Sequence, residues 1–272
     1  MAQKIAGTVG RGGRNLAADV RLVQTQLRAH GFPPGPADGI CGPRTIAAIV
    51  GFQQSFLRHP DGVIAPGGPT WRRLSALPNG TAPNGLPPRL AGEPSLVLVP
   101  RPPEGTVNIG LRAVSNRLML ELFGNPRESY GQDCQGVTNQ GLSRNMVTGQ
   151  AGPVRVTGLA PAVESLRAVF RDVQTAFPDL YPFIGTAGML CCRFQRGSTR
   201  AISNHSWGTA IDLKLHGVLD ARGDNRVQFG LTLIAPIFNR HGWYWGAAFQ
   251  TEDAMHFEGS QKLVTRWRAA LS

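Results

Sequence analysis

The sequence has little of several features that mark large protein classes. Of its 272 residues only 17% are charged, 7% are aromatic and four are cysteine. No apolar run approaches the ~18 residues that a membrane-spanning helix needs. The N-terminus MAQKIAGTVGRGG also lacks the apolar core of a secretory signal. We therefore expect synthesis in the cytoplasm without a signal peptide, so that any action outside the cytoplasm requires another route.

Acidic residues are scarce as well. There are 17 of them against 28 basic residues, which gives a formal charge of +11. The basic residues are spread along the chain, without the run of like charges that forms a nucleic-acid-binding tail. An arginine stripe with interleaved aromatic residues is not apparent either, so we expect no nucleic-acid partner. A diffuse positive charge favours peripheral approach to anionic polymers or membrane surfaces.

The four cysteines match no metal-binding C-x-x-C pattern; they are Cys41, Cys134, Cys191 and Cys192. The adjacent pair 191–192 reads as structural, because free cysteine is commonly buried as a small hydrophobe. In an oxidising compartment Cys134 could form a disulfide with either member of that pair.

Proline and glycine divide the chain into two modules. Residues 77–104 contain eleven of them and show no helical period, which predicts a semi-rigid linker. It separates an N-terminal module, residues 1–76, from a C-terminal module, residues 105–272. Hydrophobic residues make up 42% of the chain, which is enough for packed cores.

The N-terminal module has the pattern of three short helices. Apolar spacing predicts a helix over 19–30, a second after residue 42, and a helical turn around Trp71. Asp–Gly turns precede the second and third elements. The module contains no paired carboxylates and no Cys/His cluster, so we interpret it as a binding module.

A specific motif runs through this module. It reads D-G-x-x-G-x-x-T-x-x-A-(I/V)-x-x-F-Q, then D-G-x-(I/V) and T-W-x-x-L, and resembles the peptidoglycan-binding domain found beside many cell-wall hydrolases. The matching residues are Asp38, Gly39, Gly42, Thr45, Ala48, Ile49, Phe52 and Gln53. The resemblance implies a three-helix fold and peptidoglycan as the partner, although most of these residues serve as turn or core positions.

The C-terminal module mixes helices with short strands. Apolar spacing predicts helices over 111–123, 162–177 and 231–240 and after Ser260, and strands over 209–215, 243–245 and 254–258. Helices placed around a few short strands indicate the α+β class with a short antiparallel sheet.

Two stretches of this module carry candidate chemistry: SNHSWGTAIDLK at 203–214 and EDAMHFE at 252–258. His205 and Asp212 are seven residues apart, so on one straight strand they would point to opposite faces. They can converge only if the chain bends between them, and Gly208 permits that bend. Beyond it, Ile211 and Leu213 alternate with Asp212, which predicts that the carboxylate faces a cleft.

Two histidines and a carboxylate are a sufficient ligand set for catalytic zinc, which takes three protein ligands and leaves a fourth position open. Here they are His205, Asp212 and His256. Asp253, three residues before His256, is placed to act as the base that accepts a proton from water. A serine triad built on Ser203 is disfavoured, because a serine two residues before its histidine is poorly placed to reach it.

The joint spacing S-x-H-x-x-G-x-A-x-D, followed by W-x-W-G and D-x-M-H-F-E, resembles the zinc D-Ala-D-Ala carboxypeptidases of the VanY type. It also resembles the related L-alanyl-D-glutamate endopeptidases of phage endolysins. The resemblance implies that His205, Asp212 and His256 bind Zn²⁺ and that Asp253 is the catalytic base.

The same resemblance implies that Arg193 holds the substrate near the scissile carbonyl, with Arg196 and Arg200 as close competitors. Ser203 either contacts substrate or caps the turn. From the residues themselves, Glu258 lies on the same strand face as His256 and could orient it.

Asp253 occupies a position where the carboxypeptidase branch generally has glutamate and the endolysin endopeptidases have aspartate. A shift of register to Glu252 would break the three-residue spacing to His256. This difference favours an endopeptidase. We expect Trp243 and Trp245 to line the wall of the site or the hydrophobic core rather than to form a surface on which sugars stack.

We therefore expect a monomeric, zinc-dependent peptidoglycan hydrolase that cuts an L-Ala–D-Glu or D-Ala bond of the stem peptide, with its N-terminal module held on the wall. Such a protein would act on the cell wall, in the periplasm, after release as a phage endolysin or injection as an effector. The alternatives are a D,D-carboxypeptidase that acts as a secreted effector and a non-catalytic wall-binding protein.

Overall fold

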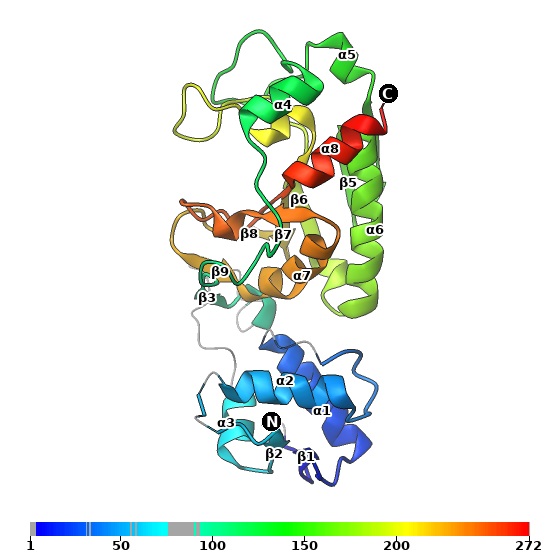
Figure 1. Cartoon of the computed structure of the whole chain (residues 1–272), viewed down its shortest axis with the longest axis vertical. Helices are drawn as coiled ribbons and strands as arrows, with labels where there is room; N and C mark the ends of the chain where they lie inside the picture. The colour runs from blue at the N-terminus through cyan, green and yellow to red at the C-terminus, as the bar shows by residue number, and fades with distance from the viewer. Residues whose placement is uncertain are drawn as a thin grey trace. The chain divides into compact units, whose positions relative to one another are not determined.

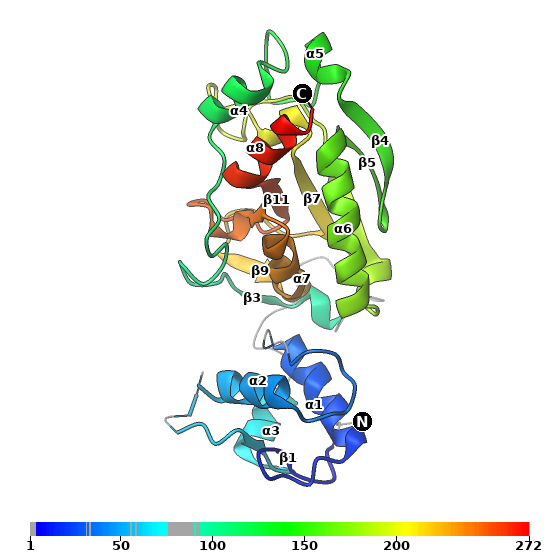
Figure 2. The ribbon, with the colours of Figure 1, turned by 45° about the vertical axis from the view of Figure 1, so that its right-hand side comes forward.

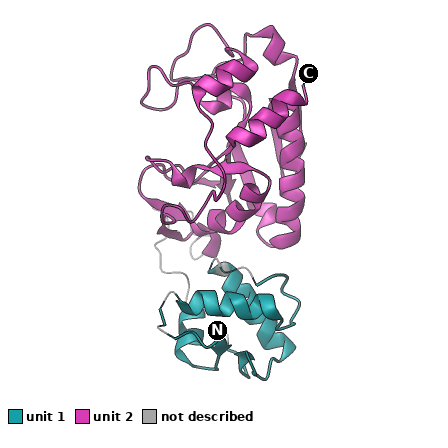
Figure 3. Cartoon of the chain, viewed as in Figure 1, with its two compact units in different colours: residues 1–82 teal, residues 83–272 magenta. Residues whose placement is uncertain are grey.

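The computed structural model describes residues 4–30, 32, 34–54, 56–57, 59–75, 90 and 93–271. The chain forms two compact units, Met1–Ala82 and Pro83–Ser272 (Figure 3). In the described part of the chain, no helix is both long and apolar enough to span a membrane.

The described residues of the first unit form three helices and a small ribbon (Figure 1). The helices are α1 (Ala17–Ala29), α2 (Pro43–Gln54) and α3 (Pro69–Leu74). The strands β1 (Val9–Gly10) and β2 (Val63–Ile64) pair antiparallel. Apolar side chains from all three helices and from both strands form one core, as the helical spacing predicted.

A buried glutamine fixes each of the two Asp–Gly turns of this unit. In both cases the side-chain amide donates to the aspartate and to a threonine of the next helix, while the amide oxygen accepts from the glycine N–H. The first set is Gln24 with Asp38 (2.9 Å), Thr45 (3.1 Å) and Gly39 (2.9 Å). The second is Gln53 with Asp61 (2.6 Å), Thr70 (3.3 Å) and Gly62 (2.8 Å). The unit therefore contains the same hydrogen-bonded turn twice.

The second unit is built on a five-stranded antiparallel sheet. Its order is β10 (Trp243–Trp245), β11 (His256–Gly259), β7 (Ala210–Leu215) and β6 (Ile184–Gly188), and β8 (Val218–Leu219) also pairs with β7. The register sets His256 directly opposite Asp212. The two tryptophans of β10 are buried, as predicted.

Helices surround this sheet, in agreement with the predicted α+β class. They are α4 (Asn116–Phe123), α5 (Gln140–Ser143), α6 (Ala160–Ala176), α7 (Phe229–Arg240) and α8 (Gln261–Ala269), with the 3₁₀ turns Tyr181–Phe183, Asn204–Trp207 and Gly246–Ala248. A hairpin of β4 (Met146–Ala151) and β5 (Val154–Leu159) packs against α6, and α6 contacts α7 (Figure 2). The sequence analysis did not predict this hairpin.

Two predicted boundaries were wrong. The helix predicted over 111–123 begins only at Asn116, because the Ser115 hydroxyl caps it by accepting from the Leu118 N–H at 3.2 Å. The strand predicted over 254–258 begins at His256, because the chain turns just before it: the His256 N–H donates to the Asp253 carbonyl.

The predicted linker, residues 77–104, is too long at its C-terminal end. Residues 77–89, 91 and 92 lie outside the described part of the chain, but Pro94–Leu96 form a 3₁₀ turn and β3 (Leu98–Pro100) pairs antiparallel with β9 (Arg226–Gln228). Backbone pairing and burial of Leu96 therefore make this segment part of the second unit despite its prolines.

Of the two disulfides left open by the sequence, the structure contains Cys134–Cys191, with Cα atoms 5.0 Å apart. Cys192 is buried outside this disulfide, and its Sγ donates to the Ser206 carbonyl at 3.4 Å. The Cys191 N–H donates to the His205 carbonyl, so the disulfide anchors a segment that supports one of the candidate ligands.

Candidate metal centre

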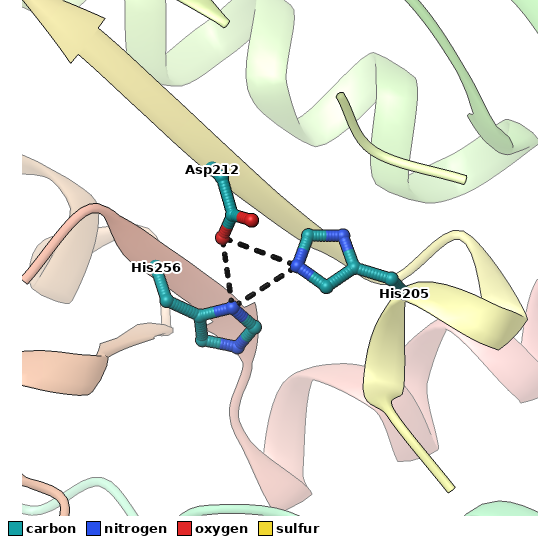
Figure 4. Close-up of side chains that lie close together, drawn as sticks. All are labelled: His205, Asp212 and His256. Atoms are coloured by element: carbon teal, nitrogen blue, oxygen red, sulfur yellow. Dashed lines mark hydrogen bonds and ion pairs between the residues drawn. The ribbon is translucent and has the colours of Figure 1, made fainter. Parts of the chain in front are cut away.

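Three elements of the second unit bring the predicted ligands together (Figure 4). His205 lies in the 3₁₀ turn Asn204–Trp207, Asp212 in the middle of β7, and His256 at the first position of β11. Ile211 and Leu213 are buried in the core, so the alternation along β7 turns Asp212 toward the pocket, as predicted.

Gly208 supplies the bend between the first two ligands. Its φ of 61° and ψ of 34° lie in the left-handed region that favours glycine. A Cβ atom there would also lie 2.8 Å from the Cα of Gly158, which leaves no space for a side chain. The position therefore requires glycine for two independent reasons.

One atom from each ligand residue points to a common centre. His205 Nε2, Asp212 Oδ1 and His256 Nδ1 are each 3.1 Å from the other two. Both histidines are almost fully buried. Among the described residues, this is the only group of three or more His, Cys, Asp or Glu side chains placed to share a metal ion.

The outer nitrogen of each ring is already occupied. His205 Nδ1 lies 2.9 Å from the Met189 carbonyl, and His256 Nε2 lies 3.1 Å from Glu258 Oε2. In neutral rings these nitrogens donate outward, so the inner nitrogens present lone pairs to the centre. Glu258 thus orients His256, as the shared strand face predicted.

The electrostatics of the centre favour a positive charge. Burial would raise the pKa of Asp212, but His205 and His256 outweigh it and hold that pKa well below its usual range. Burial would lower the pKa of His256, yet Asp212 and Glu258 raise it to about 10. A metal cation would satisfy both lone pairs and the carboxylate at once.

The geometry fits a tetrahedral metal ion. Nitrogen and oxygen ligands about 2.0–2.1 Å from such an ion are about 3.3 Å from one another, close to the 3.1 Å separations observed. Three protein ligands with two imidazoles and one carboxylate match the donor set of catalytic zinc sites.

Asp253 lies beside this centre. Its backbone carbonyl accepts from the His256 N–H at 3.1 Å, which forms the short turn predicted between them. Oδ2 is 3.4 Å from Arg222 Nε, while the buried Oδ1 has no hydrogen-bond partner. Burial raises the pKa of this carboxyl, although the nearby histidines and Arg222 oppose the rise.

A pocket of about 320 Å³ opens onto the three ligands and Asp253. Arg193, Arg196 and Ser203 also line it, whereas Arg200 does not. Burial and the neighbouring Arg196 lower the pKa of Arg193. The Ser203 N–H donates to the Arg193 carbonyl at 3.0 Å, and its side chain makes no capping bond.

Asn204 and Arg222 line this pocket but were not predicted from the sequence. Asn204 Nδ2 donates to Glu258 Oε2 at 2.7 Å, and the buried Asn204 Oδ1 has no partner. Its position next to His205 was a usable signal. Arg222 reaches the pocket from the turn after β8, and nothing in its local sequence distinguishes it from other surface arginines.

Comparison with protein families supports both modules. Residues 196–259 match the family model described as D-alanyl-D-alanine carboxypeptidase. This range includes all three candidate ligands and Asp253 but not Arg193. Residues 17–74 match a family model of a peptidoglycan binding domain. A search of curated proteins finds no match.

The chain therefore joins a domain similar to D-alanyl-D-alanine carboxypeptidases to one similar to peptidoglycan binding domains, which is the modular arrangement that the motifs predicted. Together the two matches support a peptidase that acts on peptidoglycan.

Proposed function

We propose that the protein is a zinc-dependent peptidoglycan hydrolase that cleaves an amide bond of the stem peptide, either L-Ala–D-Glu or a bond to D-Ala. The observation that carries this proposal is the convergence of His205, Asp212 and His256 on one point, with the outer nitrogens of both rings already occupied.

In this proposal His205, Asp212 and His256 hold Zn²⁺. Zinc in such a site lowers the pKa of a bound water to about 7 and so supplies a nucleophile at neutral pH. Asp253, with its free Oδ1, accepts the proton of the attacking water and delivers it to the leaving amine. Burial raises the pKa of Asp253, which makes its carboxylate a stronger base for this transfer.

Arg193 is proposed to neutralise the charge that develops on the scissile carbonyl oxygen, because it lines the same pocket. Ser203 is proposed to contact the substrate there. The first unit would hold the wall polymer and raise the local concentration of stem peptides. Action on the cell wall after release or injection belongs to the same proposal.

A second candidate is a D,D-carboxypeptidase that removes the terminal D-Ala. The description of the family matched by residues 196–259 favours it. The aspartate at position 253 favours the endopeptidase, because the resembling carboxypeptidases generally have glutamate there.

Digestion of purified sacculi followed by mass spectrometry of the muropeptides tests the proposal. We expect new amino termini with the zinc-loaded protein, none with chelator, and their appearance at least about 10²-fold more slowly with Asp253→Asn. A new N-terminal D-Glu identifies the L-Ala–D-Glu bond, and loss of one terminal D-Ala identifies the carboxypeptidase. No product from zinc-loaded protein would instead support a wall-binding protein without activity.

A further inference from the structure

The roles proposed above leave Arg222 without a function. It lies between β8 and β9, lines the pocket that holds the three candidate ligands, and has a side chain that is 35% exposed. Its single described interaction is the 3.4 Å contact from Nε to Asp253 Oδ2.

A buried carboxylate fixes the turn that carries Arg222. Glu252 is fully buried and accepts from the N–H groups of Gly223 (3.1 Å) and Asn225 (3.2 Å) through Oε2, and from that of Ala254 (3.0 Å) through Oε1. Since Glu252 precedes Asp253 directly, one side chain holds both the arginine turn and the segment of the candidate base.

The segment around β3 supports the same turn from its other side. The Arg101 N–H donates to the Asn225 carbonyl at 3.0 Å, and Arg101 Nη1 contacts Asn225 Oδ1 at 3.4 Å and the Phe249 carbonyl at 3.3 Å. These contacts tie the turn to β3 and to the residue before Asp253, so they fix the backbone position of Arg222. Little conformational entropy of this turn is therefore lost when Arg222 binds a ligand.

The charges of the pocket leave Arg222 available. The pocket carboxylates Asp212 and Glu258 already face the histidines. Among the described residues, Arg222 Nε makes the one ion pair of the Asp253 carboxylate, and no residue pairs with the two terminal guanidinium nitrogens. A guanidinium has paired N–H donors that match the two oxygens of a carboxylate. The single 3.4 Å contact through Nε leaves this paired arrangement unused.

We propose that Arg222 is a specificity residue that binds a carboxylate of the substrate, held in place by Glu252. This inference rests on the proposed function, because it names a group of the stem peptide. Two carboxylates of that peptide have the required chemistry. One is the C-terminal α-carboxylate, and the other is the α-carboxylate of D-Glu, which stays free because D-Glu is linked to the next residue through its γ-carboxyl.

Matched peptides distinguish these two sources. One pair of stem pentapeptides differs only in a C-terminal carboxylate or carboxamide, and a second pair has D-glutamate or D-isoglutamine. Calorimetric titration into the metal-free full-length protein, which cannot turn the peptides over, gives the Kd of each. Digestion of sacculi by zinc-loaded protein runs alongside.

We expect the acid member of one pair to bind about 10–100-fold more tightly than its amide, as for a charge-assisted hydrogen-bonded pair. In Arg222→Gln this ratio should fall to about 2-fold, and Arg222→Lys should be intermediate because it keeps charge but not the paired donors. Arg196→Gln, which removes a charge from the same pocket, should retain most of the ratio.

Equal binding of acid and amide in both pairs by the wild-type protein would overturn the inference, as would a ratio that Arg196→Gln abolishes and Arg222→Gln does not. These results are independent of turnover. Acid-selective binding lost in Arg222→Gln, but without any digestion of sacculi, would retain the inference and reject the proposed hydrolase.

Discussion

The described buried polar side chains of the first unit are all paired, whereas the second unit contains both paired and unpaired ones. In the first, Gln24 and Gln53 are buried and each binds an aspartate, a glycine N–H and a threonine. In the second, Asn204 and Asp253 each bury an oxygen without a partner, and three ligand atoms crowd at 3.1 Å. Among the described residues, every buried side-chain nitrogen or oxygen atom without a hydrogen-bond partner belongs to the second unit.

The difference separates structural from functional polarity. A buried polar group costs free energy unless it is paired, so a satisfied one stabilises the fold. Asn204 and Asp253 line the pocket of the candidate centre, so their unpaired oxygens are available to a ligand there. Substitutions in the two units test this difference, and removal of a candidate ligand has the largest expected effect.

Removal of a ligand should abolish both metal and activity. In His256→Ala we expect zinc content near background and peptidase activity at least about 10³-fold lower, because the metal contributes several kcal/mol of transition-state stabilisation. Metal analysis and a soluble muropeptide assay measure these. His241→Ala is the matched control, since His241 pairs with Asp172 outside the cluster. Zinc retained at full stoichiometry in His256→Ala would contradict the assigned centre.

Asp253→Asn should separate the base from the metal. Its carboxylate lies outside the ligand triangle, so we expect full zinc content and a kcat that is about 10²–10⁴-fold lower. Steady-state kinetics with parallel metal analysis measures both. A variant that keeps wild-type kcat would show that another group accepts the proton.

Glu258→Gln should weaken the metal site without destroying it. Because Glu258 accepts from His256 and from Asn204, its replacement should lower zinc affinity by about 10–100-fold. Competition with a chromophoric chelator measures the affinity, and Glu164→Gln, at an exposed position away from the cluster, serves as the control. Unchanged affinity would mean that Glu258 does not orient the ligand.

Gln53→Ala tests the other side of the comparison. It leaves the Gly62 N–H and the Thr70 hydroxyl without their partner, so we expect the first unit to lose about 1–3 kcal/mol of stability. Calorimetry of the full chain should show this loss, while kcat on soluble muropeptides stays unchanged. Gln54→Ala, at the exposed neighbouring position, should alter neither quantity. A large loss of stability in Gln54→Ala would show that the effect is not specific to the buried amide of Gln53.

Much of the fold and the centre of the site could be predicted from the sequence. Helical spacing located α1, α2, α6, α7 and α8 to within a few residues, because an apolar stripe records which face is buried. The convergence of His205 and Asp212 could be predicted because the bend at Gly208 and the alternation along β7 are local properties, and the motif around His256 added the third residue of the cluster.

The rest depends on contacts between distant segments. Residues 94–100 read as linker because they lie within a longer stretch rich in proline and glycine, yet β3 pairs with β9 more than a hundred residues later. Arg222 reaches the pocket only because Glu252 and Arg101 fix its turn. No local period encodes such long-range hydrogen bonds.

Diffraction from zinc-soaked crystals, recorded on both sides of the zinc absorption edge, tests the central claim most directly. The account predicts one strong anomalous peak about 2.0–2.2 Å from His205 Nε2, Asp212 Oδ1 and His256 Nδ1. A fully occupied peak elsewhere in a protein that digests sacculi, with none between these three atoms, would contradict it.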